Sequence, residues 1–153
     1  MVLIALSFCD LRATLMTIDP IYSHDGIHDR LTNCAAPPLI YSHLNRMISG
    51  SSRSRAPLTL ASISISILSS LEQILSIAHV INRLMRQEDL CGRTGNFQFV
   101  VVLSGSLTDG EKLLARIRNA TNIEFTSELV QWAQEETSLQ LLYRLDLTEE
   151  LRT

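Results

Sequence analysis

The sequence predicts an α+β domain in which a four-stranded antiparallel sheet carries two helices on one face. Four segments alternate or concentrate apolar residues as strands do: 58–68, 97–103, 112–118 and 139–147. Two segments space their apolar residues as helices do: 69–86 and 126–133. The resulting order, strand-helix-strand-strand-helix-strand, is the βαββαβ order of ferredoxin-like folds. Its two crossovers place both helices on the same side of the sheet.

The first 50 residues predict an N-terminal extension made of a strand pair and a short helix. The strands are expected at 2–8 and 13–18, and Pro20 ends the second because proline cannot donate to a strand ladder. Pro37 and Pro38 open a helix that Gly50 is placed to end. The serine- and arginine-rich stretch 49–55 is then a linker. We therefore expect one domain over 1–153, with its core at 57–147.

Within that core, the first strand and helix are the most clearly patterned. Apolar residues alternate with Ser and Thr from residue 58, and a change of phase predicts a bulge near Ala61 and Ser62. Ser69 and Glu72 have the spacing of a capping box at the start of the helix 69–86. The polar stretch 88–95 is expected to be a turn.

The second half of the core leaves one alternative open. Residues 112–118 alternate as a strand does, but Thr108 and Glu111 have capping-box spacing, so 109–119 could be helical instead. We favour the strand. Thr126 or Ser127 can begin the second helix, and 139–147 carries the most regular strand alternation in the sequence.

This arrangement leaves one face of the sheet without helices. That face would carry Arg116, Arg118, Leu142 and Arg144 together with Ser62, Ser64 and Ser66. Arg46, Arg53 and Arg55 add a basic patch without acids. The candidate interaction surface therefore consists of Arg116, Arg118, Leu142, Arg144, Arg46, Arg53 and Arg55.

Composition favours a protein that associates with itself or with another protein. Apolar residues make up 46% of the 153 residues and charged residues 19%, against about 25% charged in an average domain. Such a chain tends to leave apolar surface uncovered, and a second copy is the simplest partner. No catalytic or cofactor motif is recognisable. The leading hypothesis is a non-enzymatic assembly protein that needs no cofactor.

The segment Pro37–Leu44, continuing to Gly50-Ser51-Ser52 and Ala56-Pro57, resembles the proline-aromatic helix and following loop of rhabdovirus matrix proteins. The hairpin expected at 97–110 is also similar in pattern. The resemblance implies a structural protein of the viral matrix type. The basic, proline-rich N-terminal tail typical of that family is missing here.

Two other function classes stay open. His24, Asp25, His28 and Asp29 could hold a metal ion, which would make the protein a small metal-dependent hydrolase. The third class is a regulatory domain that binds a small ligand. Cys34, Cys91 and His43 could also meet at a zinc ion, but buried inert thiols are the favoured interpretation of the cysteines.

Charge and cysteine content bear on partners and location. A net charge of −3 argues against nucleic acid as a partner. Residues 95–100 show a partial likeness to the aromatic strand of RNA-recognition domains, but strand parity directs Phe97 and Phe99 to the core. Three cysteines without a CxxC pair favour a reducing, intracellular and cytoplasmic location. No transmembrane segment is expected, and peripheral membrane contact would have to use the arginine-serine stretch.

Overall fold

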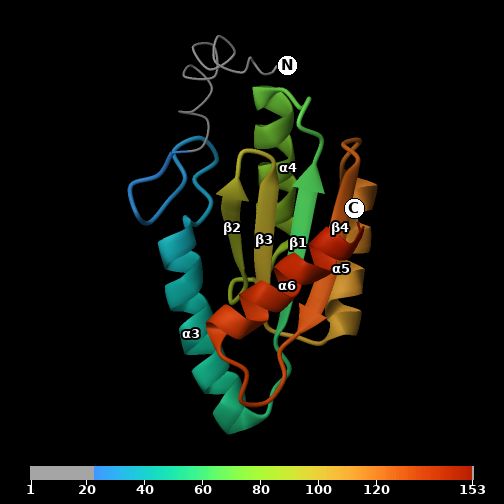
Figure 1. Ribbon diagram of the computed structural model, residues 1–153. Coiled ribbons are helices and arrows are strands. Elements are labelled where there is room, and N and C mark those ends of the chain that lie inside the picture. The colour runs from blue at the N-terminus through green and yellow to red at the C-terminus, as the bar shows by residue number, and fades with distance from the viewer. Residues whose placement is uncertain (1–22, 153) are drawn as a thin grey trace.

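The computed structural model describes residues 23–152 and arranges them around a four-stranded antiparallel sheet of order β2-β3-β1-β4 (Figure 1). The strands are β1 (Thr59–Ile65), β2 (Leu90–Gly95), β3 (Gln98–Leu103) and β4 (Phe125–Gln131). The helices are α3 (Pro37–Ser54), α4 (Leu71–Leu84), α5 (Leu107–Ala120) and α6 (Ser138–Arg152). From β1 to β4 the order is βαββαβ, which confirms the predicted fold class. The predicted strands at 2–8 and 13–18 lie outside the described residues.

Strand β1 is one of the two central strands of the sheet. It pairs with β3 on one side and β4 on the other, both antiparallel. Its register is continuous from Thr59 through Ile65, so the predicted bulge at Ala61 and Ser62 is wrong. The register shift lies in β2 instead, between Arg93 and Gly95.

Helix α4 begins with a capping box one residue later than predicted. The Ser70 hydroxyl accepts from the Gln73 N–H at 3.2 Å, and the Gln73 side chain accepts from the Ser70 N–H at 2.8 Å. These bonds satisfy two donors that the first helical turn leaves unpaired. The helix then buries residues at helical spacing: Ile74, Ile77, Ala78, Val80 and Ile81.

After α4, the strand predicted at 97–103 is confirmed as β3, but the other element assignments are wrong, although the fold class is right. The predicted turn 88–95 contains strand β2, and the predicted strand 112–118 lies in helix α5. The predicted helix 126–133 is mostly strand β4, and the predicted strand 139–147 lies in helix α6. Helix formation at 109–119, the alternative left open, is confirmed. Its capping box uses Ser106 and Asp109 rather than Thr108 and Glu111.

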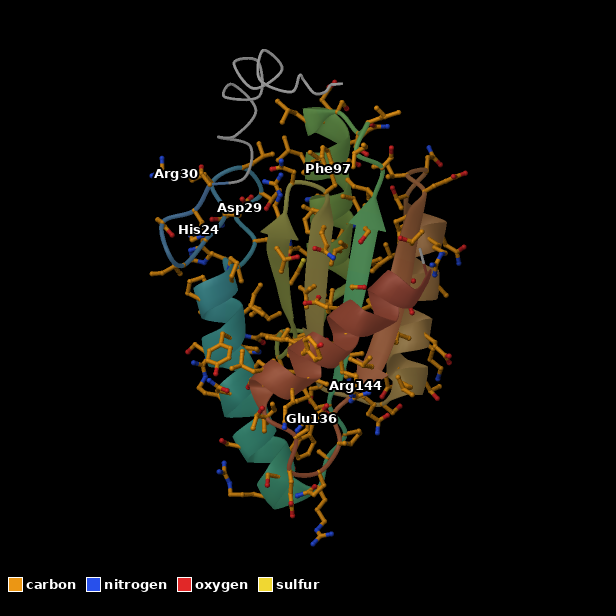
Figure 2. The ribbon with its side chains drawn as sticks, in the orientation of Figure 1. His24, Asp29, Arg30, Phe97, Glu136 and Arg144 are labelled. Atoms are coloured by element: carbon orange, nitrogen blue, oxygen red, sulfur yellow. The ribbon has the colours of Figure 1, made fainter. Side chains whose placement is uncertain are left out.

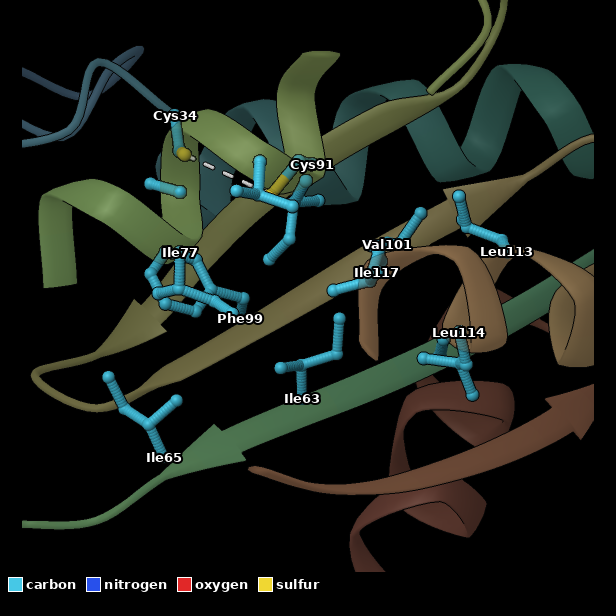
Figure 3. Packing of buried hydrophobic residues seen from close by; sticks show 14 of the residues in the cluster. Cys34, Ile63, Ile65, Ile77, Cys91, Phe99, Val101, Leu113, Leu114 and Ile117 are labelled. Carbon is cyan, nitrogen blue, oxygen red and sulfur yellow. Dashed lines mark hydrogen bonds between the residues drawn. The ribbon is translucent and has the colours of Figure 1, made fainter. Parts of the chain in front are cut away.

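Two helices cover one face of the sheet, as predicted, but the second is α5 and not the helix expected at 126–133. Ile63 of β1, Phe99 and Val101 of β3 point to this side and pack against apolar residues of both helices (Figure 3). Phe99 is fully buried, which confirms its predicted place in the core. The cluster also includes Cys34 and Cys91.

The other face is covered as well, by α3 and α6 (Figure 1). Leu60 of β1 and Val102 of β3 pack there against Leu44 of α3 and Leu141 of α6. Ser62, predicted to be exposed, is 1% exposed. The prediction of a free sheet face is therefore wrong, because α6 occupies it.

The junction between β4 and α6 holds α6 in that position. Trp132 is buried, and its indole N–H donates to the Glu136 carbonyl at 2.8 Å. Arg144 donates to both carboxylate oxygens of Glu136, each at 2.9 Å, and to the Gln131 carbonyl at 2.6 Å (Figure 2). Together these contacts tie the loop after β4 to the second turn of the helix.

The stretch 50–54, predicted as a linker, forms the last turn of α3. The helix passes through Gly50, and Arg55 ends it in the left-handed conformation at φ 61°. Among the helices of residues 23–152, none is both long and apolar enough to span a bilayer.

Candidate functional site

The seven predicted interaction residues do not form one surface. Arg116 and Arg118 lie on α5, on one side of the sheet, whereas Leu142 and Arg144 lie on α6, on the other. The three remaining arginines are exposed on or just after α3: Arg46, Arg53 and Arg55. The sheet face that was expected to carry Arg116, Arg118, Leu142 and Arg144 is covered by α3 and α6.

Several of the seven side chains already have local partners. The Arg118 guanidinium lies 4.5 Å from the centre of the Phe125 ring and donates to the Ser127 hydroxyl at 2.9 Å. Arg46 donates to the Ser42 hydroxyl at 3.2 Å within α3. Arg144 is held by Glu136, and Leu142 packs partly into the core under α6.

The histidine-aspartate loop does not gather a metal site. The Asp25 carboxylate accepts from the N–H groups of His28 and Ile27, and these bonds lower the pKa of Asp25. Asp29 turns inward, where Arg93 donates to its two carboxylate oxygens at 3.1 and 3.0 Å, and both side chains are fully buried. No group of three or more His, Cys, Asp or Glu side chains suited to a metal occurs among residues 23–152. The metal-site prediction is therefore wrong for this loop.

Cys34 and Cys91 lie together in the core, with their sulfurs 3.9 Å apart. The contact with Cys91 and further hydrogen bonds from Thr32 and Asn82 lower the pKa of Cys34 to about 6, against the opposing effect of burial. The same contact, together with burial, raises the pKa of Cys91. The two thiols are thus chemically different, and Cys34 is the one that ionises first.

A pocket of about 160 Å³ lies between the end of α4, the end of β3 and the start of α5. Its walls carry three cations and two carboxylates on an apolar floor. The lining residues are Leu84, Arg86, Asp89, Leu103, Asp109, Lys112, Leu113 and Arg116. Of the seven predicted interaction residues, it includes Arg116.

Arg86 is oriented by the residues around it. The Asp89 carboxylate is 1% exposed and accepts from the Arg86 Nε at 3.4 Å and from the Ser104 N–H at 3.0 Å. Arg86 Nη2 donates to the Ser104 carbonyl at 2.5 Å. The side chain of Arg86 is still 50% exposed. Asp89 therefore positions a guanidinium whose outer edge faces the solvent.

Asp109, in the first turn of α5, supplies an exposed carboxylate to the pocket. One of its oxygens accepts from the N–H and hydroxyl of Ser106, and these bonds lower the pKa of Asp109. The side chain is therefore a carboxylate at neutral pH. Lys112 lies three residues later on α5 and adds a positive charge.

This arrangement suits a planar ligand that has both acceptors and donors on one edge and carries negative charge. An arginine can donate two parallel hydrogen bonds to a pair of ring acceptors, and a carboxylate accepts from ring N–H groups. The pocket volume is close to that of a cavity of about 150 Å³ that holds a benzene ring. One ring system fits inside, and the rest of the ligand would extend toward Lys112 and Arg116.

Sequence reasoning missed Arg86, Asp89 and Lys112. The available signal was the pair Arg86 and Asp89, three residues apart just after a helix. Nothing in the sequence alone showed that β3 and α5 would bring Ser104 and Asp109 beside that pair.

No protein-family model matches the chain, and no curated protein matches its sequence. Solved structures do match. The GGDEF domain of PA1120 (TpbB or YfiN) from Pseudomonas aeruginosa is 19% identical over 81% of this chain and 87% of that chain, with a TM-score of 0.73. The GGDEF domain of DgcB from Caulobacter crescentus, in complex with c-di-GMP, is 20% identical over 85% and 92%, with a TM-score of 0.72.

A third match is the diguanylate cyclase SiaD from P. aeruginosa, in complex with its activator SiaC. It is 20% identical over 93% of this chain and 63% of that chain, with a TM-score of 0.73. The chain thus has the fold of GGDEF domains. Read as residues, that name spells Gly-Gly-Asp-Glu-Phe, a pentapeptide absent from this sequence. The segment Gly95–Phe99, at the β2–β3 hairpin, has the same first and last residues but no acid.

These matches correct the leading functional prediction. An assembly protein of the viral matrix type is wrong, because the solved structures similar to the chain are bacterial GGDEF domains. The prediction that the protein is not an enzyme is contradicted by its likeness to a diguanylate cyclase. The intracellular location stays a prediction.

Proposed function

We propose that this domain binds a guanine dinucleotide of the cyclic di-GMP class at the Arg86 pocket. This develops the ligand-binding alternative that the sequence left open. The observation that carries it is the grouping of Arg86, positioned by Asp89, with the exposed carboxylate of Asp109 and the cations Lys112 and Arg116.

Guanine matches the two walls of the pocket. It presents O6 and N7 as adjacent acceptors, the pair to which arginine most often donates in base recognition. Its N1–H and N2–H groups are donors that a carboxylate such as Asp109 can accept from. Adenine has a donor in place of O6, so the same arrangement would disfavour it.

The cations at the mouth of the pocket match the phosphates. Lys112 and Arg116 lie about one turn apart on α5, and both line the pocket. Charge-assisted hydrogen bonds to phosphate are stronger than neutral ones. The names of two similar structures support the ligand class, since both describe GGDEF domains with cyclic di-GMP.

The test is a calorimetric titration of the purified chain with cyclic di-GMP. We expect Arg86→Ala to weaken binding by about 5- to 150-fold, the range that corresponds to the loss of one bidentate base contact. Arg83→Ala is the matched control, because Arg83 is exposed on the last turn of α4 and does not line the pocket. We expect its affinity to stay within a factor of two.

Two further titrations distinguish recognition of the guanine base from attraction of the phosphates to positive charge. Cyclic di-AMP should bind much more weakly than cyclic di-GMP, whereas simple attraction of phosphate would treat the two alike. Lys112→Ala should weaken binding and reduce its dependence on salt. Failure of cyclic di-GMP to bind at millimolar concentration, or equal binding by Arg86→Ala, would contradict the proposal.

A further inference from the structure

The two core cysteines are opposite each other, Cys34 in the segment before α3 and Cys91 in β2. Ala35 forms a parallel bridge with Gly92, through hydrogen bonds from the Ala35 N–H to the Cys91 carbonyl and from the Arg93 N–H to the Ala35 carbonyl. This register sets Cys34 directly across from Cys91, one residue earlier on each segment. Because side chains alternate along a strand, both point to the same face.

This geometry is compatible with a disulfide without movement of the backbone. Neighbouring strands lie about 4.8 Å apart, within the range of about 4.4–6.8 Å that disulfides span between Cα atoms. The sulfurs already contact each other at 3.9 Å (Figure 3). The sulfurs must still approach from this contact distance to the bond length of about 2.05 Å, and rotation of the two side chains can supply that movement.

The surroundings favour Cys34 as the sulfur that reacts first. Asn82 Nδ2 donates to the Cys34 sulfur at 3.4 Å, and the contact with Cys91 also stabilises its thiolate. A thiolate, rather than a thiol, is the nucleophile in oxidation by peroxide. The contact with Cys34 and burial raise the pKa of Cys91, so Cys91 stays protonated and can supply a proton in the second step.

We propose that Cys34 and Cys91 form an oxidation site, at which a hydroperoxide oxidises Cys34 and Cys91 then closes an intramolecular disulfide. In the first step the Cys34 thiolate attacks one peroxide oxygen. The S–O bond forms, the O–O bond breaks, and the second oxygen leaves as hydroxide, giving a sulfenic acid. In the second step the Cys91 sulfur attacks Cys34, the S–O bond breaks, and water leaves with the Cys91 proton. In total, two thiols and one hydrogen peroxide give one disulfide and two waters.

Burial restricts the oxidant to a small molecule. Both cysteines are 2% exposed, so glutathione disulfide and bulky thiol reagents cannot reach them in the folded protein. Hydrogen peroxide is close to water in size and can enter when the loop at 23–34 opens locally. The product would bind the segment before α3 covalently to β2.

The test uses Cys9→Ser protein, which leaves only the two core cysteines. After treatment with hydrogen peroxide, we expect the intact mass to fall by 2 Da and the protein to remain monomeric. Trypsin should then release the peptide of residues 31–46 joined to the peptide of residues 87–93, since cleavage occurs after Arg30, Arg46, Arg86 and Arg93. Glutathione added as an internal standard shows that the peroxide was active.

Two variants test the order of the steps. After the peroxide is removed, each variant is unfolded in the presence of dimedone, so that the reagent reaches both positions. In Cys91→Ala the sulfenic acid on Cys34 should persist and give a dimedone adduct, whereas in Cys34→Ala no adduct should form on Cys91. Circular dichroism shows whether each variant folds, and the cross-linked peptide from the parent does not depend on either. Closing this loop should also raise the Tm of the parent by on the order of 10 °C.

Absence of the cross-linked peptide while the added glutathione is fully oxidised would overturn the proposal. A disulfide found only between molecules would do the same. A dimedone adduct on Cys91 but not on Cys34 would overturn the assigned order. None of these readouts involves the Arg86 pocket, so the result is independent of nucleotide binding.

Discussion

At the scale of single residues, the buried contact between Asp29 and Arg93 connects parts of the chain that are 64 residues apart. Arg93 also donates to the carbonyls of Gly95 and Asn96, at 3.1 and 2.9 Å, and so fixes the β2–β3 turn. Removing one partner of such a pair leaves a buried charge without compensation. The sequence suggested neither role, because Asp29 looked like a member of a loop cluster and Arg93 like part of a polar turn.

We predict that Asp29→Ala lowers the free energy of unfolding by about 3–5 kcal/mol, because it leaves the Arg93 guanidinium buried without its anion. Glu88→Ala removes the carboxylate of an exposed ion pair with Arg86 and should cost less than about 1 kcal/mol. Urea denaturation of the two variants beside the parent gives both values. A cost for Asp29→Ala no larger than that for Glu88→Ala would contradict the prediction.

At the scale of elements, α5 and α6 are helices with capping residues at their starts, although their side-chain alternation had indicated strands. In α6 the apolar residues alternate from Leu139, but the buried ones are Leu141 and Leu145, four apart as on one helix face. Thr137 and Gln140 exchange hydrogen bonds at 2.9 and 3.2 Å in the manner of a capping box. That spacing was present in the sequence and predicts the helix. Alternation alone was the weaker signal.

Strand β2 could not be predicted in this way. Its residues Cys91, Gly92 and Arg93 are buried in succession, because one side meets α3 and the other meets the core under α4. A Cβ at Gly92 would lie 2.0 Å from the Ile40 Cδ1, so the close approach of α3 requires glycine there. The sequence of β2 does not alternate apolar and polar residues as a half-buried strand does. Its glycines and polar residues are typical of a turn.

We predict that Glu136→Gln reduces stability at pH 7 by about 1 kcal/mol and that the difference disappears at low pH. The hydrogen bonds from Arg144 lower the pKa of Glu136, so the folded state binds its proton less readily than the unfolded state. The stabilisation is thus present above the unfolded pKa and is lost as pH falls through the folded pKa. Arg144 is 42% exposed, which keeps the effect small.

Denaturation of Glu136→Gln and the parent at several pH values between 7 and 3 provides this measurement. Glu135→Gln is the matched control, since Glu135 is the exposed neighbour in the same loop. Its difference from the parent should stay near zero throughout. A Glu136→Gln deficit that grows as the pH falls would show that the sign is wrong.

At the scale of the whole molecule, the fold class was predictable although several elements were not. The pattern of β1 and α4 was correct, and the later elements were displaced along the chain while keeping the order strand-strand-helix-strand. The parity of β1 and β3 correctly identified the face under α4 and α5. The second face could not be assigned, because it depends on α6, which was taken for a strand. The pocket was missed for a related reason, since it forms only where three elements meet.

Ligand binding at that pocket should stabilise the entire domain. At 100 times its dissociation constant, a ligand that binds only the folded state adds about 2.7 kcal/mol. For a domain of this size we predict a rise in Tm of about 5–10 °C with cyclic di-GMP. The rise should be strongly reduced in Arg86→Ala at the same concentration and preserved in Arg83→Ala. An equal rise in both variants would place the ligand elsewhere.

The position of Trp132 makes its fluorescence a probe of the junction between β4 and α6. It is the single tryptophan of the sequence, and its buried indole donates a hydrogen bond to the Glu136 carbonyl in the loop between β4 and α6. Release of α6 from the sheet would expose the ring to water and shift its fluorescence emission to longer wavelength. Because no other tryptophan contributes, the emission spectrum follows one known junction, and detachment of α6 can be timed separately from the collapse of the rest of the structure.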